Sequence, residues 1–211
     1  MKRAIFFDLD GTLWDALIPL TDAWNLAMEK SNLPYRFDVK TMQSYMGLLP
    51  EETVPLAFPD VDMESGLKLF KITLDTEIEY LAKQPGKLYK NEEKVICSLS
   101  KKYPLYIISN ADKGYVENYL NACNMGKYYS GHFNAGDTGM PKWKNILLMK
   151  EKENIDEVIY VGDTLKDKEE SEKAGVRFIH ARYGFGKIEN EKNYIDSLEE
   201  LPNKIEEMFN K

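Results

Sequence analysis

The sequence lacks the features of a secreted or membrane-embedded chain. Its 211 residues include only two cysteines, Cys97 and Cys123, which form no metal-spaced pair. This usage disfavours a disulfide scaffold and leads us to expect a cytoplasmic protein. No apolar run approaches the ~18 residues of a membrane span. The apolar run at residues 4–7 is too short for a signal peptide.

An excess of basic residues is also missing. The formal net charge is −7. Nonspecific nucleic-acid binding needs a basic surface, so we expect no nucleic-acid partner. Hydrophobic residues make up 43% of the chain and charged residues 30%, which is ordinary for a globular protein. The length suits one good-sized domain, or one domain with an insertion.

Short apolar runs separated by helix-like segments predict the fold class. The expected strands are Ala4–Leu9, Leu105–Ser109, Val158–Val161, Val176–Ile179 and a shorter one at Phe133–Ala135. The helix-like segments between the later strands are Lys113–Cys123, Trp143–Glu153 and Lys166–Ala174, the last followed by Gly175 as a C-cap. This alternation predicts an α/β fold, with a Rossmann-like parallel sheet covered by helices on both faces.

One region interrupts the alternation. Residues 15–83 contain no convincing strand, and Leu17–Lys30, Val39–Tyr45 and Met63–Leu81 have apolar residues at helical spacing. We therefore predict an α/β core formed by residues 1–14 and 84–211, interrupted after its first strand by a helical cap formed by residues 15–83. Most of the net negative charge falls in this insert.

Polar residues follow three of the predicted strands. They are Asp8, Asp10, Gly11 and Thr12 after the first strand, Ser109 and Asn110 at the second, and Asp163 with Asp167 after the third. In an open parallel sheet, ligands bind at the carboxyl ends of the strands. We therefore expect these groups to converge on one site.

The acids among them suit a hard metal ion. Asp8 and Asp10 are two residues apart, so both side chains point the same way if the strand runs to its end. Two carboxylates that close repel unless a cation separates them. Together with Asp163 they favour Mg²⁺, which binds carboxylates, waters and phosphate oxygens. Gly11 permits a sharp exit from the strand, and Thr12 can hydrogen-bond its own loop.

Such a set of groups is suited to phosphoryl transfer. A carboxylate can act as the nucleophile, and a second acid can protonate the leaving oxygen. Ser109 and Asn110 are placed to donate to phosphate oxygens. An ammonium group should complete the site, and either Lys142 or Lys144, just before a predicted helix, offers one.

Four motifs in this order resemble the haloacid dehalogenase (HAD) superfamily of aspartate-nucleophile phosphatases. They are DLDGT at 8–12, Ser109 in LYIISN, Lys142 in TGMPKWKNI and GDTLKD at 162–167. Their order and spacing agree with the family over essentially the whole chain. The helical insert resembles the family's first type of cap, found in phosphoglycolate-phosphatase-like members. Pro141 before the lysine departs from the more usual lysine–proline order.

The resemblance implies a role for each motif residue. Asp8 would attack phosphorus, and Asp10 would act as general acid and then as base. Mg²⁺ would be held by Asp8, by the backbone carbonyl of Asp10 and by Asp163. Lys142 would also neutralise Asp8, with Lys144 as the fallback, and Asp167 would orient the lysine or a metal-bound water. The implied phosphate-binding residues are Gly11, Thr12, Ser109, Asn110 and Lys142.

Three further stretches leave alternatives open. Trp14 either packs at the hinge between core and insert or lines the entry to the site. Residues 45–49 form either a specificity loop of the cap or a plain turn. Residues 183–186, YGFG, predict a loop near the site with residues in the left-handed conformation.

The expected function is Mg²⁺-dependent hydrolysis of a small phosphorylated metabolite through an aspartyl-phosphate intermediate. A phosphomutase of the β-phosphoglucomutase type is an alternative, and so is an inactive relative that only binds its ligand. The acid at Asp10 disfavours dehalogenation, because the family's dehalogenases lack it. The helical insert argues against a signalling receiver domain. We expect a monomer or a weak homodimer, with no membrane partner.

Overall fold

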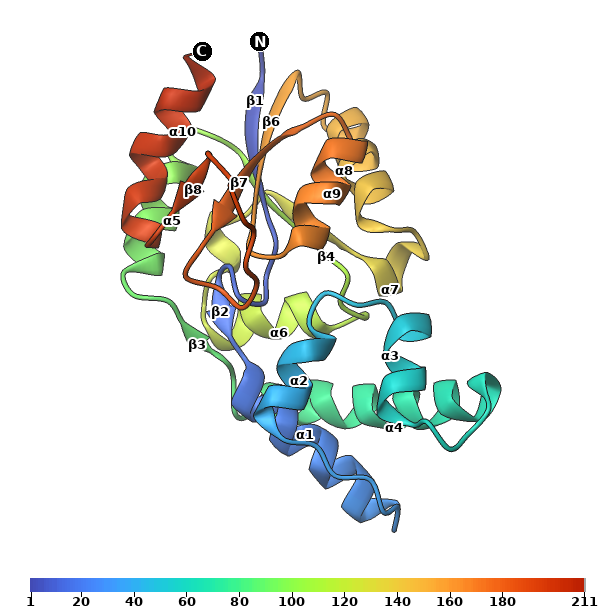
Figure 1. Ribbon diagram of the computed structural model, residues 1–211. Helices are drawn as coiled ribbons and strands as arrows, with labels where there is room; N and C mark the ends of the chain where they lie inside the picture. Colours follow the sequence, from blue (N-terminus) through green and yellow to red (C-terminus); the bar gives the residue numbers. More distant parts are fainter. Residues whose placement is uncertain (211) are drawn as a thin grey trace.

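A computed structural model describes residues 1–210, and a six-stranded parallel sheet lies at the centre of this part of the chain (Figure 1). The strands are β1 (Arg3–Phe7), β4 (Leu105–Ser109), β5 (Gly131–Asn134), β6 (Glu157–Gly162), β7 (Arg177–Ala181) and β8 (Tyr194–Ile195). Their spatial order is β5-β4-β1-β6-β7-β8, and every neighbouring pair is parallel. The first strand therefore lies in the middle of the sheet, between β4 and β6. This arrangement confirms the predicted fold class.

Helices cover both faces of the sheet. They are α5 (Glu92–Ser100), α6 (Tyr115–Ala122), α8 (Lys142–Lys152), α9 (Leu165–Lys173) and α10 (Leu201–Phe209), together with the short α7 (Ala135–Thr138). Ile5 and Phe7 share a buried cluster with residues of α5, α6 and α10, whereas Ala4 and Phe6 share one with residues of α8. Alternate residues of β1 thus enter different clusters, which explains the unbroken apolar run. No helix in residues 1–210 has the length and apolar surface that crossing a membrane requires.

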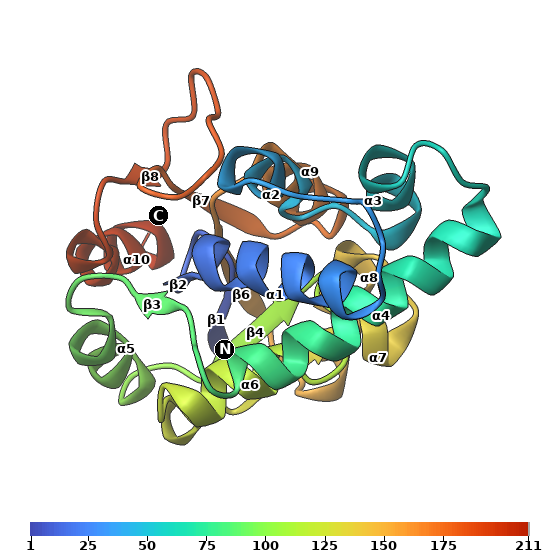
Figure 2. The same cartoon turned by 90° about the horizontal axis from the view of Figure 1, so that it is seen from below.

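Four helices lie together beyond the carboxyl ends of the strands (Figures 1 and 2). They are α1 (Leu17–Lys30), α2 (Val39–Tyr45), α3 (Pro50–Ala57) and α4 (Met63–Leu81). The chain enters this group after β2 (Trp14–Asp15) and leaves it before β3 (Lys87–Leu88), and these two strands pair antiparallel. We propose on this basis the division predicted above, with residues 1–14 and 84–211 as the core and 15–83 as the cap.

The first strand is shorter than predicted. β1 ends at Phe7, not at Leu9, because the Leu9 carbonyl accepts hydrogen bonds from the amides of residues 12, 13 and 14, and the chain turns there. Gly11 has a φ of +76° within this turn. Asp8 therefore stands at the strand end and Asp10 in the turn, and the two do not project from one face of an extended strand. The strand predicted at 133–135 is found at Gly131–Asn134.

A buried acid on α5 predicts a pH-dependent stability. Glu92 is 1% exposed, and its carboxylate accepts hydrogen bonds from Tyr119 Oη at 2.6 Å and from the Tyr89 amide at 3.1 Å. Burial nevertheless raises the pKa of Glu92 from 4.5 to about 8. An acid whose pKa is higher in the folded than in the unfolded state makes folding more favourable at low pH, where it is protonated, than at high pH. That contribution is lost as pH rises through the folded pKa.

We therefore expect the free energy of unfolding to fall between about pH 5 and about pH 9, by about 5 kcal/mol for Glu92, and the melting temperature to fall with it. Differential scanning calorimetry across this range should show a smaller fall in Glu92→Gln. The variant keeps part of the slope, because burial also raises the pKa of Glu77 to about 8. Glu93→Gln, at the exposed neighbouring position, is the matched control and should keep the wild-type slope. An unchanged slope in Glu92→Gln would contradict the assignment.

Candidate active site

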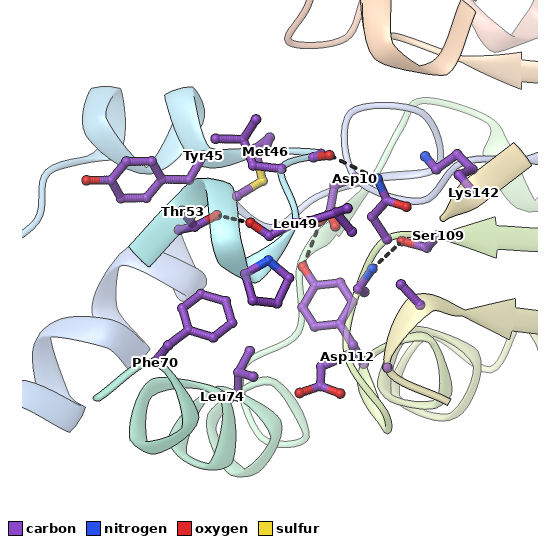
Figure 3. Close-up of a pocket in the computed structure, with 18 of the residues that line it drawn as sticks. Asp10, Tyr45, Met46, Leu49, Thr53, Phe70, Leu74, Ser109, Asp112 and Lys142 are labelled. Atoms are coloured by element: carbon purple, nitrogen blue, oxygen red, sulfur yellow. Dashed lines mark hydrogen bonds between the residues drawn. The ribbon is translucent and has the colours of Figure 1, made fainter. Parts of the chain in front are cut away.

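A cavity of about 340 Å³ lies between the strand ends and the cap helices. Asp8, Asp10, Ser109, Asn110 and Lys142 all line it. They come from the ends of β1 and β4 and from the first turn of α8. Figure 3 shows Asp10, Ser109 and Lys142 on the core side of this cavity. Five predicted site residues, up to 134 positions apart in the chain, thus meet in one place.

Lys142 is buried between two of the predicted acids. Its Nζ donates to Asp8 Oδ1 at 2.8 Å and to Asp167 Oδ1 at 2.5 Å. Burial alone would lower the pKa of Lys142, but Asp167 and Asp8 raise it well above its usual value. Pro141 is the N-cap of α8, so the unusual proline–lysine order starts the helix at Lys142 and does not displace the ammonium. Lys144 is exposed, so Lys142 is the lysine that reaches the acids.

Asp163 is held by the loop at residues 183–186. Its Oδ2 accepts from the amides of Phe185 at 2.7 Å and Gly186 at 3.2 Å, and Thr12 Oγ1 lies 3.4 Å from Oδ1. A Cβ on Gly184 would lie 2.4 Å from Asp163 Cβ, so only glycine fits this close approach. The prediction of left-handed residues in this loop is wrong. Within the described chain no glycine of the loop has a positive φ, and close packing explains its glycines instead.

Asp167 is fully engaged by its neighbours. Its Oδ2 accepts from the Thr164 amide at 3.0 Å and from Thr164 Oγ1 at 2.6 Å, and its Oδ1 accepts from Lys142. Thr164 and Asp167 form a capping box at the start of α9. The sequence pattern T-x-x-D signals this box, although Thr164 was not among the predicted site residues. Asp167 therefore accepts the Lys142 ammonium from the first turn of α9.

The acids at this point fit a hard divalent cation. Asp8, Asp163 and Asp167 each place a carboxylate oxygen within 4.8 Å of the others. Burial and Asp167 raise the pKa of Asp8 to about 7, despite the opposing effect of Lys142. Burial, with Asp167 and Asp8, also raises the pKa of Asp163 well above its usual value. One lysine among three buried carboxylates leaves an excess of negative charge, and oxygen ligands of this kind suit Mg²⁺. The carboxyl of Asp10 is outside this group.

Asp10 is oriented by two buried aromatic residues. Its Oδ1 accepts from Trp14 Nε1 at 3.0 Å and from Tyr115 Oη at 2.7 Å. Burial raises the pKa of Asp10 to about 6, although both hydrogen bonds oppose the shift. A carboxyl with such a pKa can give and take a proton near neutral pH. Trp14 thus both packs in the core and holds Asp10. The sequence around Tyr115 gives no sign of its contact with Asp10, because the two residues lie 105 positions apart.

Comparison with known proteins identifies the family of this chain. Residues 5–181 match the family model described as haloacid dehalogenase-like hydrolase. The chain belongs to this family. The resemblance stated from the four motifs is thereby confirmed.

Individual relatives of this HAD-like hydrolase are distant in sequence. A phosphoglycolate phosphatase from Shigella dysenteriae is 23% identical, over 87% of this chain and 82% of its own length. A haloacid dehalogenase-like family hydrolase from Streptococcus pneumoniae has a TM-score of 0.82 at 20% identity, over 97% of this chain and 98% of that one. A β-phosphoglucomutase from Clostridium difficile has a TM-score of 0.75 at 17% identity, and each chain is covered completely. The two structures establish a shared fold.

Three predicted phosphate-binding residues of this HAD-like hydrolase, Gly11, Thr12 and Ser109, differ in whether they reach the cavity. Gly11 and Thr12 are not among the described residues that line the cavity, and their amides donate to the carbonyls of Trp14 and Leu9. Ser109 Oγ lines the cavity and accepts from the Ala111 amide at 3.1 Å. Its hydroxyl proton therefore stays available to a ligand. Phosphate binding by Gly11 and Thr12 stays a prediction.

Polar contacts join the cap to the core beside the cavity of the hydrolase. Asn110 Nδ2 donates to the Gly47 carbonyl at 3.0 Å, and Gln43 Nε2 donates to the Phe185 carbonyl at 3.3 Å. Lys166 on α9 pairs with Glu52 on α3. All five residues of the segment 45–49 line the cavity. This segment is therefore placed to contact a ligand, which favours the specificity loop over a plain turn.

Proposed function

We propose that this chain is a Mg²⁺-dependent phosphatase that hydrolyses a small phosphorylated metabolite through an aspartyl-phosphate on Asp8. The observation that carries the proposal is the buried Asp8–Lys142 pair, 2.8 Å apart at the base of a cavity that Asp10 and Ser109 also line. In this proposal, Asp8 is the nucleophile and Lys142 is the cation that binds the phosphate. The names of the phosphoglycolate phosphatase relatives support phosphomonoester hydrolysis.

The residues act in two steps. First, an oxygen of Asp8 forms a bond to phosphorus while the bond from phosphorus to the ester oxygen breaks, and Asp10 gives its proton to the leaving alcohol. Lys142 and the Ser109 hydroxyl donate to the phosphoryl oxygens. Then Asp10 accepts a proton from a water whose oxygen attacks phosphorus, which frees Asp8 and inorganic phosphate.

Asp8 and Asp163 would hold Mg²⁺, with the backbone carbonyl of Asp10. When bound, the ion neutralises the charges of the nucleophile and the phosphate. Among the described residues, no protein group donates to Asp8 Oδ2. Asp163 Oδ1 has only the 3.4 Å contact with Thr12 Oγ1, because the loop amides donate to Oδ2. Asp167 has no such free oxygen, so we assign it to positioning Lys142.

The mutase alternative is disfavoured by the cap side of the cavity. A β-phosphoglucomutase shares this fold, but a sugar presents several hydroxyl groups to its site. Leu20, Met42, Phe70 and Leu74 line this side and offer no hydrogen bonds. Tyr45, Glu51, Thr53 and Glu77 are polar residues on this side, so they would replace only part of the hydrogen bonds to water that a sugar loses against the apolar side chains. A phosphatase releases free phosphate and forms no phosphorylated product. A mutase would transfer the phosphoryl group back to the sugar, so measuring both products separates the two reactions.

Phosphate release from an aryl phosphate tests the function directly. We expect turnover by the purified chain in Mg²⁺ and a fall of about 100-fold or more after chelation by EDTA, because the buried acids then repel the phosphate. Excess Mg²⁺ should restore the rate, which controls for denaturation by the chelator. Full activity in EDTA would contradict the metal dependence, and no phosphate release under any of these conditions would contradict the phosphatase.

A further inference from the structure

The cavity has two chemically different sides. The reacting groups line the core side, whereas large apolar and aromatic side chains line the cap side: Leu20, Trp24, Met42, Tyr45, Phe70 and Leu74. Figure 3 shows Tyr45 and Phe70 across the cavity from Asp10, Ser109 and Lys142. A phosphoryl group bound on the core side would direct its leaving group toward these aromatic rings.

On the cap side, the ring of Trp24 packs against the rings of Tyr45 and Phe70. The ring centroid of Trp24 lies 5.9 Å from that of Tyr45 and 5.6 Å from that of Phe70, at interplanar angles of 34° and 84°. All three residues line the cavity. Grouped aromatic rings attract organic cations, because the ring faces carry negative electrostatic potential.

A buried carboxyl group stands beside these rings. Glu77 on α4 is 6% exposed and lines the cavity. Its Oε2 accepts from Trp24 Nε1 at 2.9 Å, but within residues 1–210 no group donates to its Oε1. Burial raises the pKa of Glu77 to about 8. The protein thus keeps an acid with an unfilled acceptor next to an aromatic cluster, where its charge is unfavourable without a cation.

Within residues 1–210, the cavity lining offers no second cation to an anionic leaving group. Lys142 is the one lysine or arginine among the described residues that line it, and Asp8 and Asp167 already engage it. Glu51, Glu77 and Asp112 add further acidic groups to the lining. A leaving group with its own carboxylate, such as glycolate, would face like charges and no cation. The substrate in the name of the phosphoglycolate phosphatase relatives therefore does not suit this cavity.

We propose that the substrate is a phosphomonoester of a small amino alcohol, whose positively charged nitrogen binds between Glu77 and the rings of Trp24, Tyr45 and Phe70. This inference rests on the proposed phosphatase function and names its substrate class. The nitrogen takes no part in the reaction. The ester P–O bond breaks, Asp10 protonates the alcohol oxygen, and the amino alcohol leaves with its charge unchanged.

Matched substrates test the proposal in the full-length protein with Mg²⁺. Phosphocholine is compared with 3,3-dimethylbutyl phosphate, in which carbon replaces the charged nitrogen, and phosphoethanolamine is compared with propyl phosphate. We expect kcat/KM for each cationic ester to exceed that for its neutral partner by about tenfold or more, and phosphoglycolate to be the poorest substrate. The two pairs distinguish a quaternary from a primary ammonium.

Variants assign the preference to Glu77. Glu77→Gln keeps an acceptor for Trp24 Nε1 but loses the charge, so the cationic-to-neutral ratio of kcat/KM should fall about tenfold. Glu79→Gln removes the same charge from an exposed position of α4 and should keep the wild-type ratio. An unchanged ratio in Glu77→Gln would overturn the assignment.

An aryl phosphate measured in parallel separates the hypothesis of phosphatase function from the hypothesis of an amino-alcohol substrate. If it is hydrolysed but the cationic esters show no preference over their neutral partners, the substrate class is wrong and the phosphatase function stands. If the wild-type chain hydrolyses neither the aryl phosphate nor any of the esters, the proposed function fails and the substrate class fails with it. The ratio in the wild-type chain decides the proposal even if Glu77→Gln does not fold.

Discussion

Asp8→Asn is expected to lower phosphate release from an aryl phosphate by about four orders of magnitude or more, because a neutral amide cannot attack phosphorus. The change is nearly isosteric. It removes one negative charge from the buried group of Asp8, Asp163 and Asp167, and Lys142 keeps Asp167 as a partner at 2.5 Å. The measurement is steady-state phosphate release with saturating Mg²⁺. Wild-type turnover by this variant would exclude Asp8 as the nucleophile.

Two further measurements distinguish loss of the nucleophile from loss of the folded structure in Asp8→Asn. The melting temperature of Asp8→Asn should be equal to or above that of the wild type, since burial and the repulsion by Asp167 together outweigh the attraction of Lys142 for the Asp8 carboxylate. Acid quenching of the wild-type reaction, followed by mass spectrometry, should find one phosphoryl group on the peptide that contains Asp8. The same peptide from the variant should carry none. A phosphoryl group on any other residue would identify that residue, and not Asp8, as the nucleophile.

Lys142→Met is expected to damage both activity and stability. Its ammonium is the donor between Asp8 and Asp167, and the lysine is 2% exposed. Removing one partner of a buried ionic group leaves the others uncompensated, at a cost of about 3 kcal/mol in the free energy of unfolding. The loss of a charged donor to the phosphoryl group should also lower kcat by about 1000-fold. Urea denaturation and phosphate release measure the two effects.

Lys144→Met is the matched control for this variant. Lys144 has the same side chain two positions along α8 but is exposed. We expect no more than about 0.5 kcal/mol of change in unfolding free energy, as for most surface substitutions. Equal losses of activity in the two variants would contradict the assignment of Lys142.

Much of the fold was predictable because its signals are local. The apolar strands and the polar residues at their ends are visible directly in the sequence. Helix α9 ends at Lys173 with Ala174 as its C-cap, and Gly175 follows with a φ of +65°, as the glycine predicted. Helix α5 was missed although Val95, Ile96 and Leu99 show helical spacing. Helix α3 contains Pro55, which favours a break over a helix. The two-residue strands β2 and β3 are too short for any periodic signal.

The surroundings of the site were much less predictable, because they depend on contacts between distant segments. Tyr115 reaches Asp10 across 105 positions, and Asn110 reaches Gly47 across 63. Trp24 and Glu77 lie 53 positions apart and meet only when α1 packs against α4. Each of these residues fits an ordinary helix or turn in its own segment. Motifs thus indicate the reacting groups, whereas the residues that orient them or face the leaving group become visible only in three dimensions.

The short pair of β2 and β3 has a consequence for how this chain can change in evolution. Trp14 stands opposite Leu88 and Asp15 opposite Lys87, so the cap begins and ends at neighbouring points of the backbone. An insertion, deletion or exchange between these points leaves the strand ends that carry Asp8, Ser109 and Asp163 in place. Changes in the half that faces the leaving group can therefore be accommodated without moving the backbone of the half that faces the phosphoryl group.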